Sequence, residues 1–168
     1  ATTARVINNN KSKDIRVLSF GNVYRKDDDD ATHSHQFNQV DIVWIKDGLS
    51  LLNLKWLIHE LLKYLFGSKV ETRFRLSYFP FTEPSFEVDV TCPYCNGKGC
   101  NICKNSGFIE VLGAGMLHFN VMKNANINIK TGLAAGMGID RLAMIKYRIT
   151  DIRDLYSNDF KILNQFKK

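Results

Sequence analysis

Cysteine is absent from most of this sequence. All four cysteines lie between residues 92 and 103 of a 168-residue chain. A secreted disulfide scaffold spreads its cysteines through a short chain and has little other core, whereas most of this chain is ordinary hydrophobic sequence. The distribution favours a reducing, cytoplasmic setting and a metal site.

Long apolar runs are also absent. No run reaches the roughly 18 residues that a membrane span needs, and the first 14 residues, "ATTARVINNNKSKD", have no apolar signal-peptide core. We therefore expect no membrane partner. Low-complexity tracts, internal repeats and clear linkers are missing as well. With 45% hydrophobic and 24% charged residues, the composition predicts one globular domain with its own core.

The sequence carries a net charge of +6. Such a balance is compatible with a polyanionic partner such as a nucleotide or RNA. The basic residues are scattered, so the charge alone does not locate a site. The sequence also lacks an initiator methionine, and we expect it to be a processed or cloned fragment.

Apolar periodicity predicts an antiparallel sheet with helices on it, an α+β fold. Residues 1–14 are expected to be an irregular lead-in. The first two predicted strands form a hairpin around a polar loop at 26–35. The predicted strands cover residues 15–25, 36–45, 70–78, 86–90 and 108–115.

Cap residues and glycines mark the predicted helices. Asn53 is the expected N-cap of a helix that ends at Gly67. The small residues of "TGLAAGMG" (131–138) are expected to form a flexible loop before a helix over 139–148. One or two short helices close the chain, with Asp151 and Asn158 as expected caps.

The cysteine spacing is the strongest single motif. Two C-x2-C pairs, separated by four residues, let four thiolates converge on a tetrahedral zinc ion. Four protein ligands leave no open position, so such a zinc site is structural. Reduced thiols without metal and an iron–sulfur centre are the alternatives. The predicted ligands are Cys92, Cys95, Cys100 and Cys103, within an insertion at 91–107 between two strands.

Taken alone, this zinc knuckle suggests a small RNA- or protein-binding module. "CPYCNGKG" is also similar to one repeat of the zinc domain of J-type co-chaperones. Those domains carry several such repeats, whereas this chain has one.

Three other segments carry candidate chemistry. An arginine, Arg25, ends one strand, and the return strand places Phe37, Gln39 and Asp41 on one face. A row of this kind can stack a base and hold an amine. "YFPFTEPS" places two aromatic rings on one side of a strand, with a glutamate next in register. "GMGIDR" puts Arg141 in the first turn of a helix, where an anion also meets the helix N-terminus.

Together these segments resemble the catalytic core of class II aminoacyl-tRNA synthetases, and more closely the α subunits of bacterial phenylalanyl-tRNA synthetases. "VYR…DATHSHQF" is similar to motif 2 and "GMGIDRLAMIKY" to motif 3. "SYFPFTEPSFEVDV" is similar to the phenylalanine-pocket strand and "DIRDLYSNDFKILNQF" to the C-terminal signature. Some bacterial members carry a four-cysteine insertion. The resemblance covers essentially the whole chain. It implies that residues 1–168 are a catalytic-domain fragment with motifs 2 and 3 and without motif 1.

The resemblance assigns the nucleotide-binding roles. Arg25 matches the catalytic arginine that holds the ATP α-phosphate and the substrate carboxylate. The planar guanidinium group suits this role because it can make bidentate hydrogen bonds to phosphate or carboxylate oxygens. Arg141, also catalytic, matches the arginine on the γ-phosphate. Phe37 lies under adenine with Arg141 on the other face, and His33 contacts a phosphate. Asp27 stands where the family often has a glutamate that binds the adenine amino group.

The resemblance also assigns the amino-acid pocket. Gln39 and Asp41 match the pair that receives the phenylalanine ammonium group, although the family commonly has a glutamate at the second position. Phe79 and Phe81 match the two rings that grip the substrate ring. Ala134 matches the small residue at the para end of the pocket, where a tyrosine hydroxyl would remain unsatisfied.

Glycines and a glutamate complete the implied site. Gly113 and Gly115 let the backbone lie close to the substrate. "GLAAG" departs from the usual "GFAFG" at Leu133 and Ala135, which predicts a looser pocket floor. Glu83 matches the family's magnesium ligand, at the border with a β subunit.

The implied function is ATP-dependent activation of phenylalanine and its transfer to tRNA(Phe). The implied partners are a β subunit in an α2β2 tetramer, tRNA(Phe), ATP and L-phenylalanine, with Mg²⁺ and structural Zn²⁺ as cofactors. The family's motif 1 would precede Ala1, so the isolated chain is expected to be inactive. Two alternatives remain: a zinc-knuckle RNA- or protein-binding module without catalysis, and a synthetase-like paralogue with a changed substrate.

Overall fold

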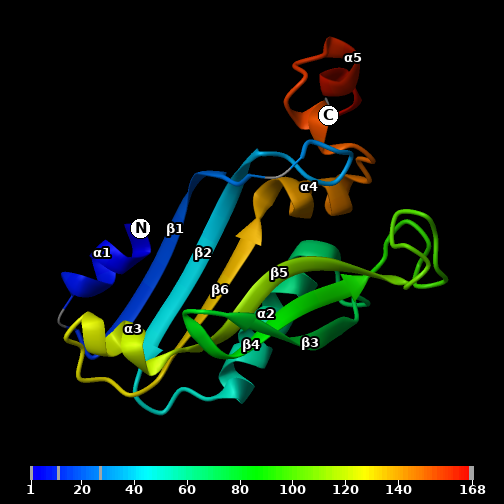
Figure 1. The fold of residues 1–168 in the computed structure, drawn as a ribbon. Coiled ribbons are helices and arrows are strands. Elements are labelled where there is room, and N and C mark those ends of the chain that lie inside the picture. The colour runs from blue at the N-terminus through cyan, green and yellow to red at the C-terminus, as the bar shows by residue number, and fades with distance from the viewer. Residues whose placement is uncertain (1, 11, 27, 167–168) are drawn as a thin grey trace.

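A six-stranded antiparallel sheet organises the protein (Figure 1). The computed structural model describes residues 2–10, 12–26 and 28–166. The strand order is β1-β2-β6-β5-β4-β3, so β6 lies between an N-terminal hairpin and a three-stranded meander. This arrangement confirms the predicted α+β fold. The strands are β1 (Asp14–Tyr24), β2 (Gln36–Lys46), β3 (Thr72–Phe79), β4 (Thr82–Thr91), β5 (Phe108–Leu117) and β6 (Gly132–Gly138).

The helices are α1 (Thr2–Asn8), α2 (Leu51–Phe66), α3 (Phe119–Asn124), α4 (Ile139–Tyr147) and α5 (Phe160–Leu163), with single 3₁₀ turns at Ile152–Leu155 and Asn164–Phe166. Helix α2 covers one face of the sheet, α1 and α3 pack against the other, α4 follows the end of β6, and α5 lies beyond α4 (Figure 1). No helix in the described part of the chain is long and apolar enough to cross a bilayer. The helix α1 shows that the prediction of an irregular lead-in was wrong. Ile7 of α1 is buried among residues of the sheet, and such tertiary packing stabilises short helices that lack a local signal.

Two predicted caps are displaced by a few residues. Ser50, not Asn53, precedes the first turn of α2, and Asn53 Oδ1 accepts hydrogen bonds from the Ser50 amide and hydroxyl, both at 2.9 Å. Asp159, not Asn158, caps α5 by accepting from the Lys161 N–H at 2.8 Å. In each case two cap-type residues lie within one turn, and composition alone does not rank them. The predicted cap Asp151 and the stop at Gly67 are confirmed.

The glycine-rich segment is a central strand, and the prediction of a flexible loop was wrong. β6 pairs with β2 on one side and β5 on the other. Glycine has low strand propensity, but pairing along both edges supplies the stability that composition does not indicate. Helix α4 begins at Ile139, directly after Gly138 at the end of β6, so no loop separates this strand from this helix.

The two pocket aromatics lie at the turn between β3 and β4, Phe79 at the end of β3 and Phe81 within the turn. β3 ends at Phe79 and β4 begins at Thr82, so Phe79 and Phe81 do not lie along one strand as predicted. Their rings stack across the turn with centroids 6.2 Å apart and an interplanar angle of 8°. Pro80 and Phe81 form the turn itself, so β3 ends before Pro80 and β4 begins after Phe81.

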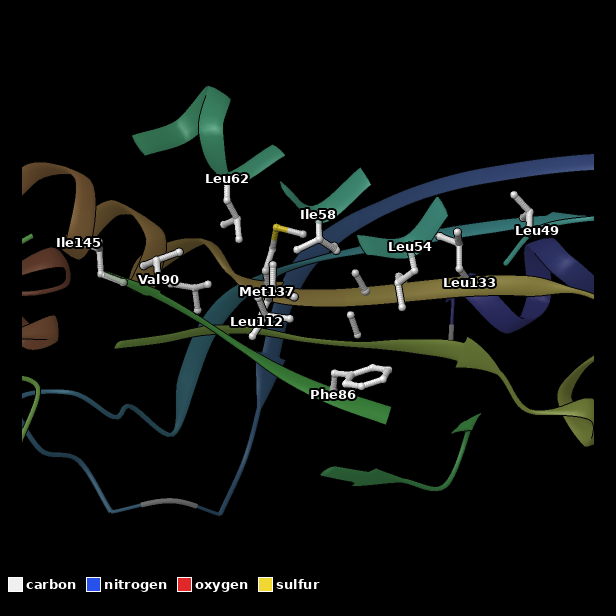
Figure 2. Packing of buried hydrophobic residues seen from close by; sticks show 14 residues of the cluster. Leu49, Leu54, Ile58, Leu62, Phe86, Val90, Leu112, Leu133, Met137 and Ile145 are labelled. Atoms are coloured by element: carbon white, nitrogen blue, oxygen red, sulfur yellow. The ribbon is translucent and has the colours of Figure 1, made fainter. Parts of the chain in front are cut away.

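The main core lies on one face of the sheet, under α2 (Figure 2). Leu54, Ile58 and Leu62 of α2 are completely buried there. They belong to one cluster with residues of β4, β5 and β6, among them Val88, Val90, Leu112, Leu133, Ala135 and Met137. On the opposite face a second cluster, from Ile7 through Val43 and Ile45 to Met122 and Ile129, covers one end of the sheet. The remainder of that face is polar or glycine-rich, and it carries the candidate site.

A buried carboxylate fastens the edge strand β3 to β4. The side chain of Asp89 is 2% exposed and accepts hydrogen bonds from two arginines of β3. Arg73 donates at 2.9 and 2.8 Å and Arg75 at 2.7 and 2.8 Å. Burial alone would raise the pKa of Asp89, but the bonds from Arg75 and Arg73 outweigh it and lower the pKa.

We predict that Asp89→Asn destabilises the protein. The substitution leaves two guanidinium groups without their shared anion. Breaking a fully buried pair costs about 3–5 kcal/mol, and the half-exposed arginines reduce this to about 2 kcal/mol. Denaturant unfolding measures the difference. The matched control is Glu60→Gln, which removes an exposed pair at 3.7 Å and should cost less than about 0.5 kcal/mol. Equal effects from the two variants would contradict the assigned role of Asp89.

The same ion pair predicts a pH dependence. A lowered folded-state pKa gives a stabilisation that is fully present above the unfolded-state pKa of about 3.9 and is lost as pH falls through the folded value. Unfolding free energy should therefore fall more steeply below about pH 4 in the wild type than in Asp89→Asn. Parallel profiles for the two proteins would argue against this assignment.

Candidate functional site

A cavity of about 230 Å³ opens on the polar face of the sheet. The loop between β1 and β2, the strands β2, β5 and β6, and the first turn of α4 form its walls. Six of the sequence-predicted site residues line it: Arg25, His33, Phe37, Gln39, Gly113 and Arg141. Asp27 lies outside the described residues.

The two predicted catalytic arginines lie at this cavity. The guanidinium carbon of Arg25 is 4.8 Å from the centroid of the Phe37 ring, a cation–π contact. Arg141 Nη2 donates to the carbonyl oxygen of Thr32 at 3.0 Å, and its Nη1 to that of Glu110 at 3.4 Å. Two guanidinium groups at one cavity favour an anionic ligand.

Asp140 positions the start of α4 against β2. It is 8% exposed, and its carboxylate accepts the backbone N–H of Asn38 at 2.6 Å. This contact fixes the helix turn that bears Arg141 beside the strand that bears Phe37 and Gln39. Asp140 was not among the sequence-predicted site residues, although an acidic residue in the first turn of a helix is a recognisable signal.

Two aspartates hold the loop between β1 and β2. Asp30 accepts the Thr32 N–H at 2.6 Å and lies 3.0 Å from His33 Nδ1. Asp29 lies 2.8 Å from His35 Nδ1. The N–H of Thr32, followed by the His33 ring, holds the pKa of Asp30 well below its usual range. Neither aspartate was among the sequence-predicted site residues, because local hydrogen bonds in a polar loop give no spacing signal.

Glycines form the floor of the cavity. Gly136 pairs with Asp41 on one side and with Gly113 on the other. A Cβ atom on Gly136 would lie 3.0 Å from Asp41 Oδ1, and one on Gly113 would lie 3.0 Å from Phe79 Cζ. Gln39 Nε2 donates to Asp41 Oδ1 at 2.7 Å. The Asp41 carboxylate, the Gln39 amide and the Phe79 ring therefore lie around a stretch of backbone that carries no side chains. Side chains on Gly113 and Gly136 would fill this space.

Several predicted pocket residues lie outside the cavity lining. Ala134 pairs with Gly115 and packs against the second hydrophobic cluster. A Cβ atom on Gly115 would lie 2.5 Å from Thr82 Cβ, so this glycine permits close packing beneath the β3–β4 turn. Phe81 is 55% exposed. The structure thus places Phe79, but not Phe81, over the glycine floor.

Leu133 and Ala135 do not face the cavity. Both are buried in the core beneath α2, at 0% and 4% exposure. The expectation that their departure from the family pattern loosens the pocket floor was therefore wrong. Alternation along β6 sends these side chains to the opposite face, and Ala134 and Gly136 to the polar one.

Glu83 lies at the start of β4, and its side chain is 78% exposed. Its carboxylate is 3.4 Å from His118 Nε2. His118 also caps α3, accepting the Asn120 N–H at 3.1 Å. An exposed carboxylate fits magnesium, which keeps several waters and uses one or two protein carboxylates with substrate phosphates.

The four cysteines form a compact cluster between β4 and β5. Three of the Sγ–Sγ distances are 3.9, 3.8 and 3.7 Å, and all four sulfur atoms lie within 4.8 Å of one another. Four thiolates around a zinc ion with bonds of about 2.3 Å are roughly 3.8 Å apart. The cysteines are free thiols. The cluster therefore has the dimensions of a tetrahedral metal site.

Backbone geometry supports this cluster. The N–H groups of Gly99 and Cys100 donate to the sulfurs of Cys95 and Cys103, both at 3.2 Å. Burial raises the pKa of Cys92 to about 12. Burial opposes ionisation of Cys103 as well, but hydrogen bonds from the Cys100 and Gly107 backbone lower its pKa to about 6. Such donors stabilise thiolates, the form that binds metal.

The comparisons with known proteins agree with this geometry. Residues 1–166 match the family described as "tRNA synthetases class II core domain (F)". The chain is 69% identical over 167 residues to the phenylalanine–tRNA ligase alpha subunit of Ureaplasma urealyticum serovar 10, covering 99% of this chain and 50% of that protein. It is 63% identical over 160 residues to the same subunit of Malacoplasma penetrans, covering 94% and 47%.

A more distant relative is the phenylalanine–tRNA ligase alpha subunit of Lactobacillus delbrueckii subsp. bulgaricus. It is 54% identical over 157 residues, covering 92% of this chain and 45% of that protein. The chain spans about half the length of the curated relatives it matches. The family match extends over the N-terminal hairpin, the meander of β3, β4 and β5, the inserted cysteines and α4. The chain therefore belongs to the tRNA synthetases class II core domain (F) family.

Proposed function

We propose that the protein carrying this chain is a phenylalanine–tRNA ligase alpha subunit. It activates L-phenylalanine with ATP and transfers the product to tRNA(Phe). The observation that carries the proposal is the cavity that joins Arg25 and Arg141 to the floor of Gly113 and Gly136. The printed names of the relatives supply the substrate identity. Residues 1–168 then represent the part of the catalytic domain that carries motifs 2 and 3 but not motif 1.

In the proposed first step, a phenylalanine carboxylate oxygen attacks the ATP α-phosphorus. The bond to the bridging oxygen breaks, and pyrophosphate leaves. Arg25 stabilises the α-phosphate and the carboxylate, and Arg141 exchanges its bonds to the Thr32 and Glu110 carbonyls for phosphate oxygens. Phe37 stacks under adenine and His33 contacts a phosphate. In this reaction the enzyme acts by positioning and charge stabilisation.

The proposed amino-acid site is the glycine floor and its neighbours. The paired Gln39 and Asp41 receive the ammonium group, and Phe79, with Phe81 stacked on it, contacts the substrate ring. Ala134 closes the para end. A hydroxyl buried there without a partner costs roughly 1–3 kcal/mol, which discriminates against tyrosine.

Two metals complete the proposal. Glu83, with its exposed carboxylate, is the protein ligand for Mg²⁺, which supplies charge neutralisation for the phosphates. Cys92, Cys95, Cys100 and Cys103 hold a structural Zn²⁺. The proposed partners are a β subunit, in an α2β2 tetramer, and tRNA(Phe), and the proposed location is the cytoplasm without a membrane partner.

The substrate proposal predicts selective binding of an adenylate mimic. In the full-length natural protein, a non-hydrolysable phenylalanyl-adenylate analogue should bind at least about tenfold more tightly than the tyrosyl analogue, because the para wall offers its hydroxyl no partner. Calorimetric titration measures both affinities. Tighter binding of an unrelated aminoacyl analogue would contradict the proposed substrate. ATP-independent RNA binding that requires the cysteines would instead favour a zinc-knuckle module.

The glycine floor predicts a sharp steric effect. In Gly113→Ala, the added methyl group displaces the Phe79 ring, which lies 3.0 Å from the ideal Cβ position. The affinity for L-phenylalanine should fall by about tenfold or more. Gly21→Ala on β1 is the matched control, since nothing lies within 4 Å of its Cβ position. Unchanged phenylalanine affinity in a folded Gly113→Ala protein would contradict the proposed pocket.

The cysteine cluster predicts about one zinc ion per chain by elemental analysis. Removal of that metal by a chelator should lower the unfolding temperature, since a structural site couples binding to folding. Iron, or a well-folded protein without metal, would refute the zinc assignment.

A further inference from the structure

The zinc knuckle also contacts a helix that lies outside its two flanking strands. Tyr94, between Cys92 and Cys95, reaches the C-terminal end of α4. Its hydroxyl oxygen lies 3.0 Å from the carbonyl oxygen of Met144 and 2.8 Å from that of Ile149. A hydroxyl donates one proton, so it bonds one of these carbonyls at a time.

Those carbonyls belong to the cap of α4. Arg148 adopts a left-handed conformation with φ of 58°, and the N–H groups of Arg148 and Ile149 both donate to the Met144 carbonyl. Met144, Ile149 and Ile152 are buried together in a third hydrophobic cluster. Because the Met144 carbonyl already has two N–H donors, the Tyr94 hydroxyl supplies its proton to the Ile149 carbonyl, directly after the Arg148 cap of α4.

The chain that follows the cap of α4 leads to the cavity. The Ile152 N–H donates to the Ala31 carbonyl at 2.9 Å, and Ile152 lines the cavity. The neighbouring carbonyl, from Thr32, accepts from Arg141 at 3.0 Å. Arg141 also bonds Glu110, on β5 shortly after the knuckle ends. Knuckle, helix cap, loop and β5 therefore form a closed series of contacts around Arg141.

We propose that Tyr94 is a positioning residue, through which the cysteine knuckle fixes α4 and thereby the aim of Arg141 into the cavity. The inference rests on the proposed use of ATP at this cavity. It goes beyond a structural zinc site, because it links the cysteine cluster to Arg141, the proposed phosphate-binding arginine. The effect should be larger for ATP than for phenylalanine, since Arg141 lies on α4, whereas Phe79, Gln39 and Asp41 lie on strands that are held by sheet pairing.

The test is Tyr94→Phe in the full-length natural protein, which removes the hydroxyl and keeps the ring. In phenylalanine-dependent pyrophosphate exchange, the KM for ATP should rise about fivefold, as loss of one hydrogen bond implies. The KM for phenylalanine should stay within about twofold. Hydrogen exchange of the Arg148 and Ile149 amides should also accelerate.

The matched control is Tyr64→Phe, since Tyr64 lies on α2 and is 86% exposed. It should change neither KM nor amide exchange. Chelation of the metal should accelerate amide hydrogen exchange at the α4 cap in the wild type. In Tyr94→Phe, chelation should accelerate the same exchange by a smaller factor, because the hydrogen bond from the knuckle is already lost.

Unchanged ATP KM and unchanged exchange in Tyr94→Phe, with a wild type that uses ATP, would overturn the role of Tyr94. An equal rise in both KM values would show a merely structural role and would also overturn it. A wild type that binds neither ATP nor the adenylate analogue would instead refute the proposed function.

Discussion

The pairing of β6 between β2 and β5 is the constraint on which the site depends. It joins two units that are separate in the sequence, the N-terminal hairpin with Arg25 and Phe37 and the meander with Phe79. The contact is close because Gly136 faces Gly113 directly. Side chains at these positions would meet Asp41 and Phe79. Gly136, which weakens β6 as a strand, and Gly113 of β5 therefore create the space in which a ligand can lie on the sheet.

The two faces of the sheet divide the work between stability and binding. Under α2, Leu133, Ala135 and Met137 of β6 are buried in a continuous apolar core. On the other face the alternate residues of the same strand remain small. A rigid core behind a thin, side-chain-poor surface holds cavity groups in fixed positions without occupying the cavity. Asp89 extends this rigidity to the edge strand, since its arginines attach β3 by charge where apolar burial is limited.

Sequence patterns predicted the features that depend on local periodicity and fixed spacing. Strand-type composition and alternation predicted β1 to β5 but not β6, leucine spacing predicted α2, and the doubled C-x2-C motif predicted a cluster that has tetrahedral dimensions. The adjacent positions of Arg25, Phe37 and Arg141 followed from the family resemblance rather than from periodicity. The misassigned segments depend on tertiary contacts. Residues 132–138 are a strand only because both neighbours pair with them, and α1 exists beside a sheet that buries Ile7.

Residues that orient others were the hardest to anticipate. Asp140 and Tyr94 bond backbone groups far away in the chain, and such partners leave no spacing signal in either segment. Leu133 and Ala135 show the opposite error. They attracted notice by departing from a family pattern, yet the two-residue period of a strand directs them into the core.

The direct junction between β6 and α4 has a consequence for tolerated length. Gly138 is both the last residue of the strand and the residue before the helix. Because no loop absorbs a change in chain length there, one inserted residue would rotate α4 by about 100° relative to the sheet. Substitutions at this junction can be tolerated, but insertions and deletions would turn Arg141 away from the loop that it contacts. Length variation among homologous chains should therefore fall in the segments between other elements and spare this one.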